Sequence, residues 1–266
     1  MILLKTKNFF DKQMAALKEI EKDEKFFHIF QFGNDKASNV YVRNKIKDAE
    51  SLGIKTVLHK LPSWTPSAMV KSRIESASTL PSTAGIMIQF PVPEHLKGIE
   101  QLVPPHLDVD GLNKNSLFDP CTPSGIIFYL EKDLKINLEG KNICIVGRGD
   151  LVGKPLARML TDKNVTVTLC HSKTSDLRKH TLNADIVVCA IGKAKFFDSS
   201  YFNPGTIVVD VGINFDENGK ICGDVNTEEI IEDEVPIAVT AVPGGVGLLT
   251  RLALMRHLIG LDKKGE

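Results

Sequence analysis

The sequence lacks the features that would assign it to a nucleic acid, a membrane or a secreted scaffold. Its 33 lysines and arginines balance 33 aspartates and glutamates, so no overall field attracts nucleic acid or anionic lipid. No apolar run is long enough to cross a bilayer, and the apolar start at residues 1–5 is too short for a signal peptide. We therefore expect a cytoplasmic protein whose partner is a small molecule.

Metal-like spacing is also absent. The five cysteines form no CxxC pair, and four of them lie in or beside apolar runs, where a buried thiol is the usual outcome: Cys121, Cys144, Cys170, Cys189 and Cys222. His59, His95 and His106 are scattered and suggest neither a metal site nor a catalytic triad, and His171 is expected to be a loop residue. We expect reduced thiols and no metal.

The 266 residues suit one large domain or two modest ones. In the first half, strand-like runs at 26–32, 54–61 and 85–90 alternate with helix-like segments between Ser38 and Gly53 and at 66–78. In the second half, strands are expected at 142–146, 166–170, 185–190, 206–211 and 237–240. Uninterrupted apolar runs such as Ile186-Val187-Val188 predict strands buried on both faces, as in a doubly wound parallel sheet.

Two helices, from 122 to about 132 and from 246 to about 260, are expected to join the halves. The predicted class is therefore α/β with two lobes and a cleft between them. An N-terminal α/β catalytic domain covers residues 1–130 and is completed by the C-terminal helix 246–266. A Rossmann-type, doubly wound NAD(P)-binding domain covers residues 131–245.

A glycine-rich turn carries the nucleotide prediction. Residues 146–153 follow a strand and open a helix, with glycines at 147, 149 and 153 in GxGxxxG spacing. Such a turn lets the backbone approach a pyrophosphate at a helix N-terminus, although a merely structural turn is the alternative. Asp150 would repel phosphate unless it points away.

The end of the next strand bears on the choice of cofactor. An NAD site usually carries an acid there for the ribose hydroxyls, whereas this chain has none until Asp176. The hydroxyl of Ser172 and the cation of Lys173, with Arg148 nearby, suit a 2′-phosphate. NADP is therefore expected rather than NAD, and a solvated loop is the alternative interpretation.

Tyr41 and Lys45 are four residues apart on a predicted helix, so they share one face. An amine and a phenol side by side next to a core-facing stripe could perform proton chemistry in a cleft. The alternative is a surface helix with a solvated lysine.

Together these motifs resemble one family. In chain order they are Tyr41-Val42-Arg43-Asn44-Lys45, Gly85-Ile86-Met87-Ile88-Gln89-Phe90-Pro91-Val92-Pro93, Asp108-Val109-Asp110-Gly111, Pro120-Cys121-Thr122-Pro123, Val146-Gly147-Arg148, Val152-Gly153-Lys154-Pro155, Cys170-His171-Ser172, Asp210-Val211-Gly212-Ile213-Asn214 and Pro243-Gly244-Gly245-Val246-Gly247. From about Gly33 to Arg251 the chain resembles the bifunctional methylenetetrahydrofolate dehydrogenase/methenyltetrahydrofolate cyclohydrolase family.

The resemblance implies a reaction and a set of roles. Hydride passes from 5,10-methylenetetrahydrofolate to NADP⁺, and water then opens the methenyl cation to 10-formyltetrahydrofolate. Lys45 would be the principal catalytic group, best suited as a neutral amine, with Tyr41 over the folate and Gln89 hydrogen-bonded to the lysine. Asp110 would anchor the pterin, beside the loop Pro243-Gly244-Gly245. The implied cofactor-binding residues are Gly147, Arg148, Gly149, Val152, Gly153, Ser172 and Ile213. Asp108 is expected to be a turn or capping residue.

Three segments depart from the family pattern. Only residues 112–119 separate Gly111 from Pro120, a shorter connection than usual, and Gly149-Asp150 replaces a stretch with serine after the arginine. Leu248-Leu249 follows the Pro-Gly-Gly loop where Pro-Met is common. Three alternatives follow: a monofunctional cyclohydrolase that keeps the nucleotide fold as scaffold, a non-catalytic folate- or nucleotide-binding subunit, and another two-lobed dehydrogenase such as a shikimate or amino-acid dehydrogenase. The resemblance also implies a homodimer joined through the nucleotide domain.

Overall fold

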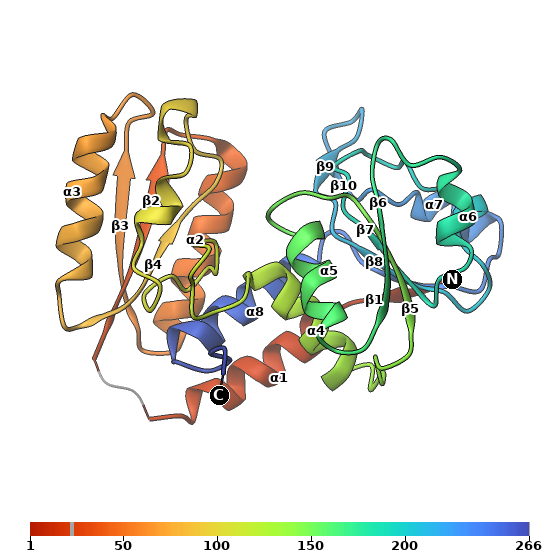
Figure 1. Ribbon diagram of the computed structural model, residues 1–266, viewed down its shortest axis with the longest axis horizontal. Coiled ribbons are helices and arrows are strands. Elements are labelled where there is room, and N and C mark those ends of the chain that lie inside the picture. Colours follow the sequence, from red (N-terminus) through yellow and green to blue (C-terminus); the bar gives the residue numbers. More distant parts are fainter. Residues whose placement is uncertain (22–23, 266) are drawn as a thin grey trace. The chain divides into compact units, whose positions relative to one another are not determined.

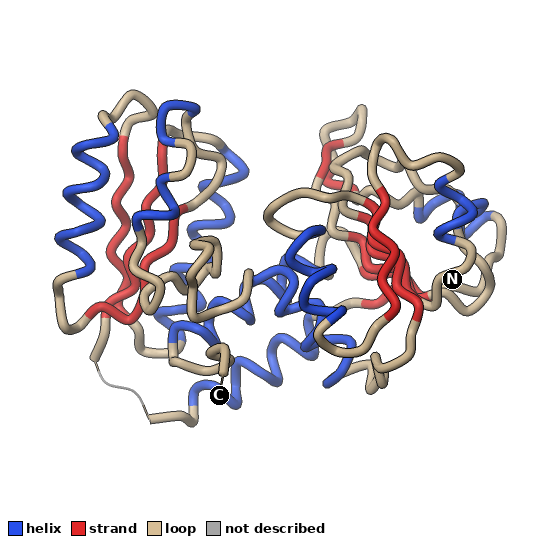
Figure 2. Tube along the Cα trace, in the orientation of Figure 1, coloured by secondary structure: helices blue, strands red, loops and turns tan. Residues whose placement is uncertain are grey.

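The computed structural model describes residues 1–21 and 24–265, which form two compact units, each with its own parallel sheet (Figures 1 and 2). The first unit contains Met1–Asp11 and Thr122–Thr250. The second contains the segment from Lys12 to Cys121 and the chain from Arg251 onward. The predicted α/β class with two parallel-sheet domains is confirmed.

The first unit is built on a six-stranded sheet of order β1-β11-β8-β7-β5-β6, in which every pair is parallel. Its strands are β1 (Ile2–Leu4), β5 (Asn142–Val146), β6 (Thr166–Cys170), β7 (Ile186–Cys189), β8 (Ile207–Asp210) and β11 (Ala238–Thr240). All four residues of β7 are buried, as their apolar character predicts. The sequence analysis did not identify β1, because three residues are too short to show a period.

The helices that lie wholly or partly in this unit are α1 (Lys7–Lys18), α4 (Cys121–Lys132), α5 (Gly153–Thr161), α6 (Leu177–Thr181), α7 (Thr227–Glu232), α8 (Val246–Leu258) and the 3₁₀ turn η3 (Ser199–Tyr201). One apolar cluster joins α4 and α5 to the sheet, and another packs Phe197, Phe202 and Ile230 against it. An antiparallel pair, β9 (Asn214–Phe215) and β10 (Ile221–Cys222), follows β8. The boundaries between the units fall inside α1 and α8 and at the first residue of α4.

The second unit is built on a three-stranded parallel sheet of order β3-β2-β4. Its elements are β2 (Phe26–Phe32), α2 (Lys36–Ser51), β3 (Lys55–Leu61), α3 (Ser67–Ser78), β4 (Thr83–Ile88), η1 (Glu94–Leu96) and η2 (Ile99–Leu102). Helices α2 and α3 cover opposite faces (Figure 1). On the α3 face, Phe30 and Ile86 pack with Ile74 in one apolar cluster.

The start of α2 differs from the sequence expectation. Ser38 was expected to bound the helix, but the cap is Asp35, whose carboxylate accepts a hydrogen bond from the Ser38 N–H at 2.7 Å. An aspartate satisfies a free amide of the first turn well, and the chain offers one three residues earlier. Ser38 instead lies inside the helix, where its hydroxyl accepts a bond from the Gln31 amide at 3.0 Å.

Candidate active site and cofactor-binding loops

Lys45 lies on the third turn of α2, with Tyr41 one turn earlier on the same helix. Only 8% of Lys45 is exposed, and its amine donates to the Gln89 Oε1 atom at 3.1 Å and contacts the Met87 Sδ atom at 3.2 Å. The surface-lysine interpretation is therefore wrong. The amine contacts two uncharged acceptors, which hold it without supplying a counter-charge.

Gln89 follows the last residue of β4, and the surrounding backbone fixes its side chain. Its main-chain N–H donates to the Phe30 carbonyl at 2.8 Å, which continues the strand pairing. Its side-chain Nε2 donates to the Phe90 carbonyl at 2.7 Å. Because the amide nitrogen is engaged there, the oxygen is turned toward Lys45.

Cys121 is a buried thiol that is influenced by both Asp110 and Lys45. Its Sγ atom donates to the Val109 carbonyl at 3.3 Å, and its N–H donates to the Asp110 carbonyl at 3.2 Å. Burial raises the pKa of the Cys121 thiol well above its usual value, and the nearby Asp110 raises it further. Lys45 acts on the same thiol in the opposite direction. Lys45, Gln89, Met87, Asp110 and Cys121 therefore belong to one polar cluster of the second unit. The only signal for Cys121 in the sequence was its place in the Pro120–Pro123 motif.

Two contacts hold α2 and its tyrosine in place. Tyr41 is half-buried, and burial raises the pKa of its phenol. Asp48, three residues after Lys45, pairs with Arg251 through two hydrogen bonds of 2.6 and 2.7 Å. This ion pair, whose Asp48 and Arg251 side chains are 8% and 16% exposed, connects α2 to α8. Nothing in the local sequence connects positions 203 residues apart.

Asp108 stabilises the short connection at 112–119 through its side chain. Its carboxylate accepts from the Asn113 N–H at 2.7 Å, so the expected capping role is confirmed. Burial raises the pKa of Asp108 to about 6, against the effect of that hydrogen bond. The Asn113 side chain in turn donates to the carbonyls of Gln101 and Val103 at 3.0 and 2.9 Å. The connection is thus ordered by its own polar contacts.

The glycine-rich turn after β5 depends on close backbone contacts. A Cβ atom on Gly147 would lie 2.0 Å from the Ala190 carbonyl oxygen, and one on Gly153 would lie 1.8 Å from the Gly147 oxygen. A Cβ atom on Gly149 would meet nothing within 4 Å. Two glycines are therefore required by the packing of the protein itself, whereas the third, Gly149, faces open space.

Asp150 does not oppose this use of the turn. Its carboxylate pairs with Lys154 at 2.7 Å and is 85% exposed. The hydrogen bond from Lys154 lowers the pKa of Asp150. Asp150 is therefore a solvated carboxylate in the glycine-rich turn, three residues before α5, and its charge is balanced by Lys154.

The remaining predicted cofactor residues lie at the carboxyl ends of the same strands. Arg148 and Ser172 are exposed beyond β5 and β6, and Ile213, beyond β8, is 47% exposed. Val152 is the residue before α5 and accepts a helical bond from Leu156 N–H. Ligands of doubly wound sheets bind at this edge, so the residues present fit an NAD(P) cofactor.

Two further predictions at this edge concern residues that stabilise loops. His171 is a loop residue, as expected: its N–H donates to the Thr174 hydroxyl at 2.9 Å. Asp176, the first acid after β6, caps α6 and accepts from the Lys179 N–H at 3.4 Å.

The Pro243-Gly244-Gly245 loop belongs to the first unit and is fixed by Thr6, which is fully buried. The Thr6 hydroxyl donates to the carbonyls of Gly244 and Gly245 at 3.2 and 2.9 Å. The side chains of Lys45, Gln89 and Asp110 belong to the second unit. The proposed contact of this loop with a folate therefore stays a prediction.

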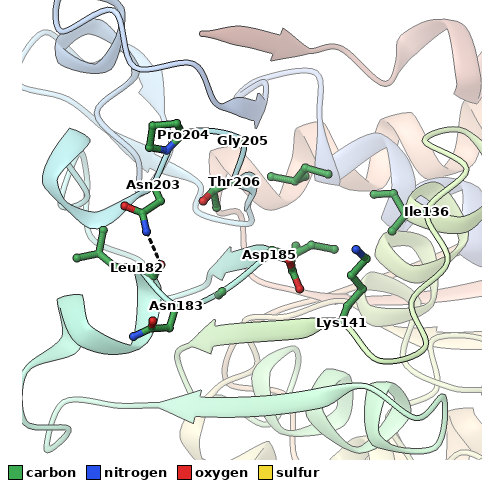
Figure 3. Close-up of a pocket in the computed structure, with 12 residues that line it drawn as sticks. Ile136, Lys141, Leu182, Asn183, Asp185, Asn203, Pro204, Gly205 and Thr206 are labelled. Atoms are coloured by element: carbon green, nitrogen blue, oxygen red, sulfur yellow. Dashed lines mark hydrogen bonds between the residues drawn. The ribbon is translucent and has the colours of Figure 1, made fainter.

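A cavity of about 520 Å³ lies at the opposite edge of the six-stranded sheet (Figure 3). Its lining includes Lys141, Asp185 and Thr206, which precede the first residues of β5, β7 and β8. Asp185 there accepts from the Asn142 N–H at 2.8 Å, and Asn203 donates to the Leu182 carbonyl at 2.7 Å (Figure 3). Both side chains therefore bond backbone groups at the amino edge of the sheet, away from the glycine-rich turn.

Within residues 1–21 and 24–265, no three histidine, cysteine or acidic side chains are grouped to hold a metal ion. Nor does any helix in this part of the chain have the length and apolar character needed to cross a membrane. His59, which sequence analysis left without a role, stacks on Phe30 and meets His28 at 3.0 Å between ring nitrogens.

The fold and the glycine-rich turn define an α/β protein with one NAD(P)-type domain and one domain carrying a lysine-centred polar cluster. Comparison with known protein families shows which family of this class the chain belongs to. The tetrahydrofolate dehydrogenase/cyclohydrolase models match residues 3–110 for the catalytic domain and residues 120–265 for the NAD(P)-binding domain. The chain belongs to the tetrahydrofolate dehydrogenase/cyclohydrolase family.

Individual relatives agree with this assignment. The bifunctional protein FolD of Agathobacter rectalis is 40% identical over 247 residues, covering 89% of this chain and 88% of that protein. The structure of the bifunctional FolD methylenetetrahydrofolate dehydrogenase/cyclohydrolase from Campylobacter jejuni is 34% identical, with a TM-score of 0.91 and 97% of both chains covered. FolD from Trypanosoma brucei, complexed with NADP cofactor and an inhibitor, is 25% identical, with a TM-score of 0.86 over 97% of this chain and 95% of that one.

Proposed function

We propose that the chain catalyses two consecutive reactions: oxidation of 5,10-methylenetetrahydrofolate with NADP⁺ and hydrolysis of the methenyl product to 10-formyltetrahydrofolate. Bifunctional relatives that match nearly end to end support the pair of activities. The observation that carries the proposal is the buried Lys45 amine held at 3.1 Å by the uncharged Gln89 oxygen. A non-catalytic binding protein has no need of an amine held in this way.

In the hydrolytic step, Lys45 handles a proton without adding a fixed charge beside the cation. A water oxygen forms a bond to the methenyl carbon while Lys45 accepts a water proton. The bond between that carbon and N5 then breaks, N5 takes a proton back, and the second water proton is released as the formyl group forms. Gln89 keeps the amine in position, and the Met87 sulfur borders the amine on the apolar side.

The remaining folate-site residues are assigned to binding. Asp110, whose carbonyl accepts from the Cys121 N–H at 3.2 Å, is proposed to accept hydrogen bonds from the amino-pyrimidine edge of the pterin through its carboxylate. Tyr41 supplies a half-buried ring for stacking. Pro243, Gly244 and Gly245 are proposed to contact the substrate through the backbone that Thr6 fixes.

When bound, NADP⁺ accepts the hydride that leaves the methylene carbon. The chain contributes the binding surface: Gly147, Gly149, Val152 and Gly153 form the turn that approaches the pyrophosphate. Arg148 and Ser172 are proposed to bind the 2′-phosphate, because both are exposed at the carboxyl ends of neighbouring strands. Ile213 is proposed to contact the cofactor beyond β8. Asp176 caps α6, which supports NADP over NAD.

Three broader features complete the proposal. The catalytic half comprises residues 1–130 with 246–266, and the NAD(P)-binding half residues 131–245. A homodimer joined through the NAD(P)-binding half is supported by the exposed apolar Phe215 and Ile221 on β9 and β10, and sedimentation analysis tests it. The cytoplasm is proposed because Cys121, Cys144, Cys170, Cys189 and Cys222 are all free, as in a reducing compartment.

The test is a spectrophotometric assay with 5,10-methylenetetrahydrofolate and either NADP⁺ or NAD⁺, run beside hydrolysis of the methenyl compound. We expect reduction with a preference for NADP⁺ together with hydrolysis. Hydrolysis without reduction would indicate that only the cyclohydrolase is retained. A folded protein with neither activity would contradict the proposal.

A further inference from the structure

One carboxylate at the carboxyl edge of the six-stranded sheet holds a whole loop. Asp224 is fully buried, and its side chain accepts from three successive backbone N–H groups, those of Ile191, Gly192 and Lys193, at 2.7, 3.1 and 2.8 Å. It also accepts from the Asn214 side-chain amide at 2.9 Å. Four donors on one buried carboxylate form a strong, geometrically defined anchor.

A second buried carboxyl group supports the first. Asp210, 2% exposed at the end of β8, accepts from the N–H groups of Gly212, Asp224 and Val225 at 2.9, 3.0 and 2.9 Å. Glycines make room for both acids. A Cβ atom on Gly212 would lie 2.3 Å from the Asp224 Oδ1 atom, and one on Gly223 would lie 1.8 Å from the Asp210 Oδ2 atom.

The loop held by Asp224 adjoins the glycine-rich turn. Residues 191–193 follow β7, which pairs directly with β5. The Ala190 carbonyl, one residue before the loop, is the atom that excludes a side chain at Gly147. A shift of the loop would therefore act on the turn that is proposed to approach the pyrophosphate. The backbone of Asp224 strengthens this connection, because its carbonyl accepts from the Phe197 N–H at 3.0 Å.

We propose that Asp224, supported by Asp210, is a positioning residue for the dehydrogenase reaction: it fixes loop 191–193 beside the glycine-rich turn in the conformation that receives the cofactor. The inference rests on the proposed function, because it requires NADP⁺ at this edge. It adds a residue that does not itself touch the cofactor. The cyclohydrolase reaction uses no cofactor, so it serves as an internal control in the same molecule.

The deciding variant is Asp224→Asn in the full-length chain. An asparagine presents one oxygen and turns an NH₂ group toward N–H donors, so it cannot hold three successive amides. We expect the KM for NADP⁺ to rise on the order of tenfold to a hundredfold, since small displacements near a reacting centre have effects of that size. Methenyl hydrolysis should stay within about twofold of the parent, because its groups lie on other elements.

Two further variants keep the test decisive. Gly212→Ala pushes on the Asp224 carboxylate without removing it and should raise the same KM, which decides the matter if Asp224→Asn does not fold. Asp185→Asn removes an exposed carboxylate that accepts a backbone N–H at the opposite edge of the same sheet. It should leave both activities unchanged.

The outcomes separate this inference from the proposed function. A parent protein that does not reduce NADP⁺ would contradict the function itself. A parent that does so, with an unchanged KM for NADP⁺ in Asp224→Asn and Gly212→Ala, would overturn the positioning role alone. A parallel loss of both activities in these variants would also overturn it, because the acids would then stabilise the fold in general.

Discussion

The two units use their sheets in different ways. In the second unit, side chains carry the proposed chemistry: a lysine on α2, a glutamine after β4 and an aspartate before α4. In the first unit, the main chain carries it, through glycines packed against carbonyl oxygens and loops held by buried acids. A site made of side chains should therefore lose activity when one of those side chains is replaced. A site made of main chain should lose it when a residue that holds the backbone in place is replaced.

The largest effect should come from removing the central side chain. Lys45→Met should reduce methenyl hydrolysis on the order of 10²- to 10⁴-fold, the range for a lost acid–base group. Cofactor binding, measured by NADPH fluorescence, should stay the same, because the cofactor residues belong to the other unit. Lys47→Met, on an exposed position of the same helix, is the matched control and should change neither. Retained hydrolysis in Lys45→Met would remove the lysine from the mechanism.

Substitutions at two glycines of the same turn distinguish the effect of packing from the effect of ligand approach. In Gly153→Ala the new methyl group would lie 1.8 Å from the Gly147 oxygen, so unfolding free energy should fall by about 1–3 kcal/mol. Dehydrogenase activity should fall with it. In Gly149→Ala the space is open, so thermal unfolding should not change while the KM for NADP⁺ rises. An unchanged KM in Gly149→Ala would mean that the ligand does not approach this residue closely.

Loss of the ion pair between Asp48 of α2 and Arg251 should have a smaller effect. Asp48→Asn should lower the unfolding free energy by about 2 kcal/mol, between the values for exposed and fully buried pairs. Hydrolysis should fall with it, because Asp48 and Lys45 share α2. The control is Asp11→Asn, which breaks an exposed pair with Lys7 and should change stability by less than about 1 kcal/mol. Equal effects of the two changes in urea unfolding would contradict this interpretation.

The smallest effects are those of pH on stability. A falling pH should weaken the contribution of the His28–His59 pair, whereas a rising pH should weaken that of the buried Asp210. Burial lowers the pKa of His28 and, together with the charge of His28, lowers that of His59 to about 4. The folded state therefore resists protonation, and its stability should fall as the pH drops from about 6.5 toward 4. Burial raises the pKa of Asp210 to about 7, so its contribution should instead weaken as the pH rises from about 4 to 7.

His59→Phe sharpens this comparison. The ring it replaces stacks on Phe30 at 4.2 Å between centroids, so phenylalanine keeps the packing and removes the titrating group. Thermal unfolding at pH 5 and pH 8 should show a smaller loss at pH 5 than in the parent. His106→Phe, at an exposed site of the same unit, should retain the parent's loss. A full loss at pH 5 in His59→Phe would mean that the pair does not govern stability in this range.

The sequence predicted the parts of the structure that repeat or alternate. The strands at 26–32, 142–146 and 166–170 have the predicted bounds, because each is a short run rich in apolar, aromatic and β-branched residues. Lys45 and Gln89 could be connected only through the family resemblance, since 44 residues separate them. Their hydrogen bond is present, and their catalytic roles remain predictions.

Other features could not be read from the sequence. Asp210 and Asp224 resemble ordinary turn acids, and only their burial and the six backbone N–H groups that donate to them show that they hold loops in place. Cys121 was expected to be a small buried residue, which it is, but its hydrogen bond to the Asp110 carbonyl depends on how a loop meets the start of α4. Contacts that depend on tertiary structure leave no period or spacing in the chain.

The pairing of β1 with β11 has a consequence for synthesis. Ile2 of β1 pairs with Ala238 of β11, and Asp48 in the other unit forms its ion pair with Arg251. Both partners are synthesised late. A chain growing from its N-terminus therefore carries the lysine of α2 long before the residues that complete either unit have been made. The last tenth of translation completes both units. A chain interrupted before that point would expose an open sheet edge and would not be an active enzyme.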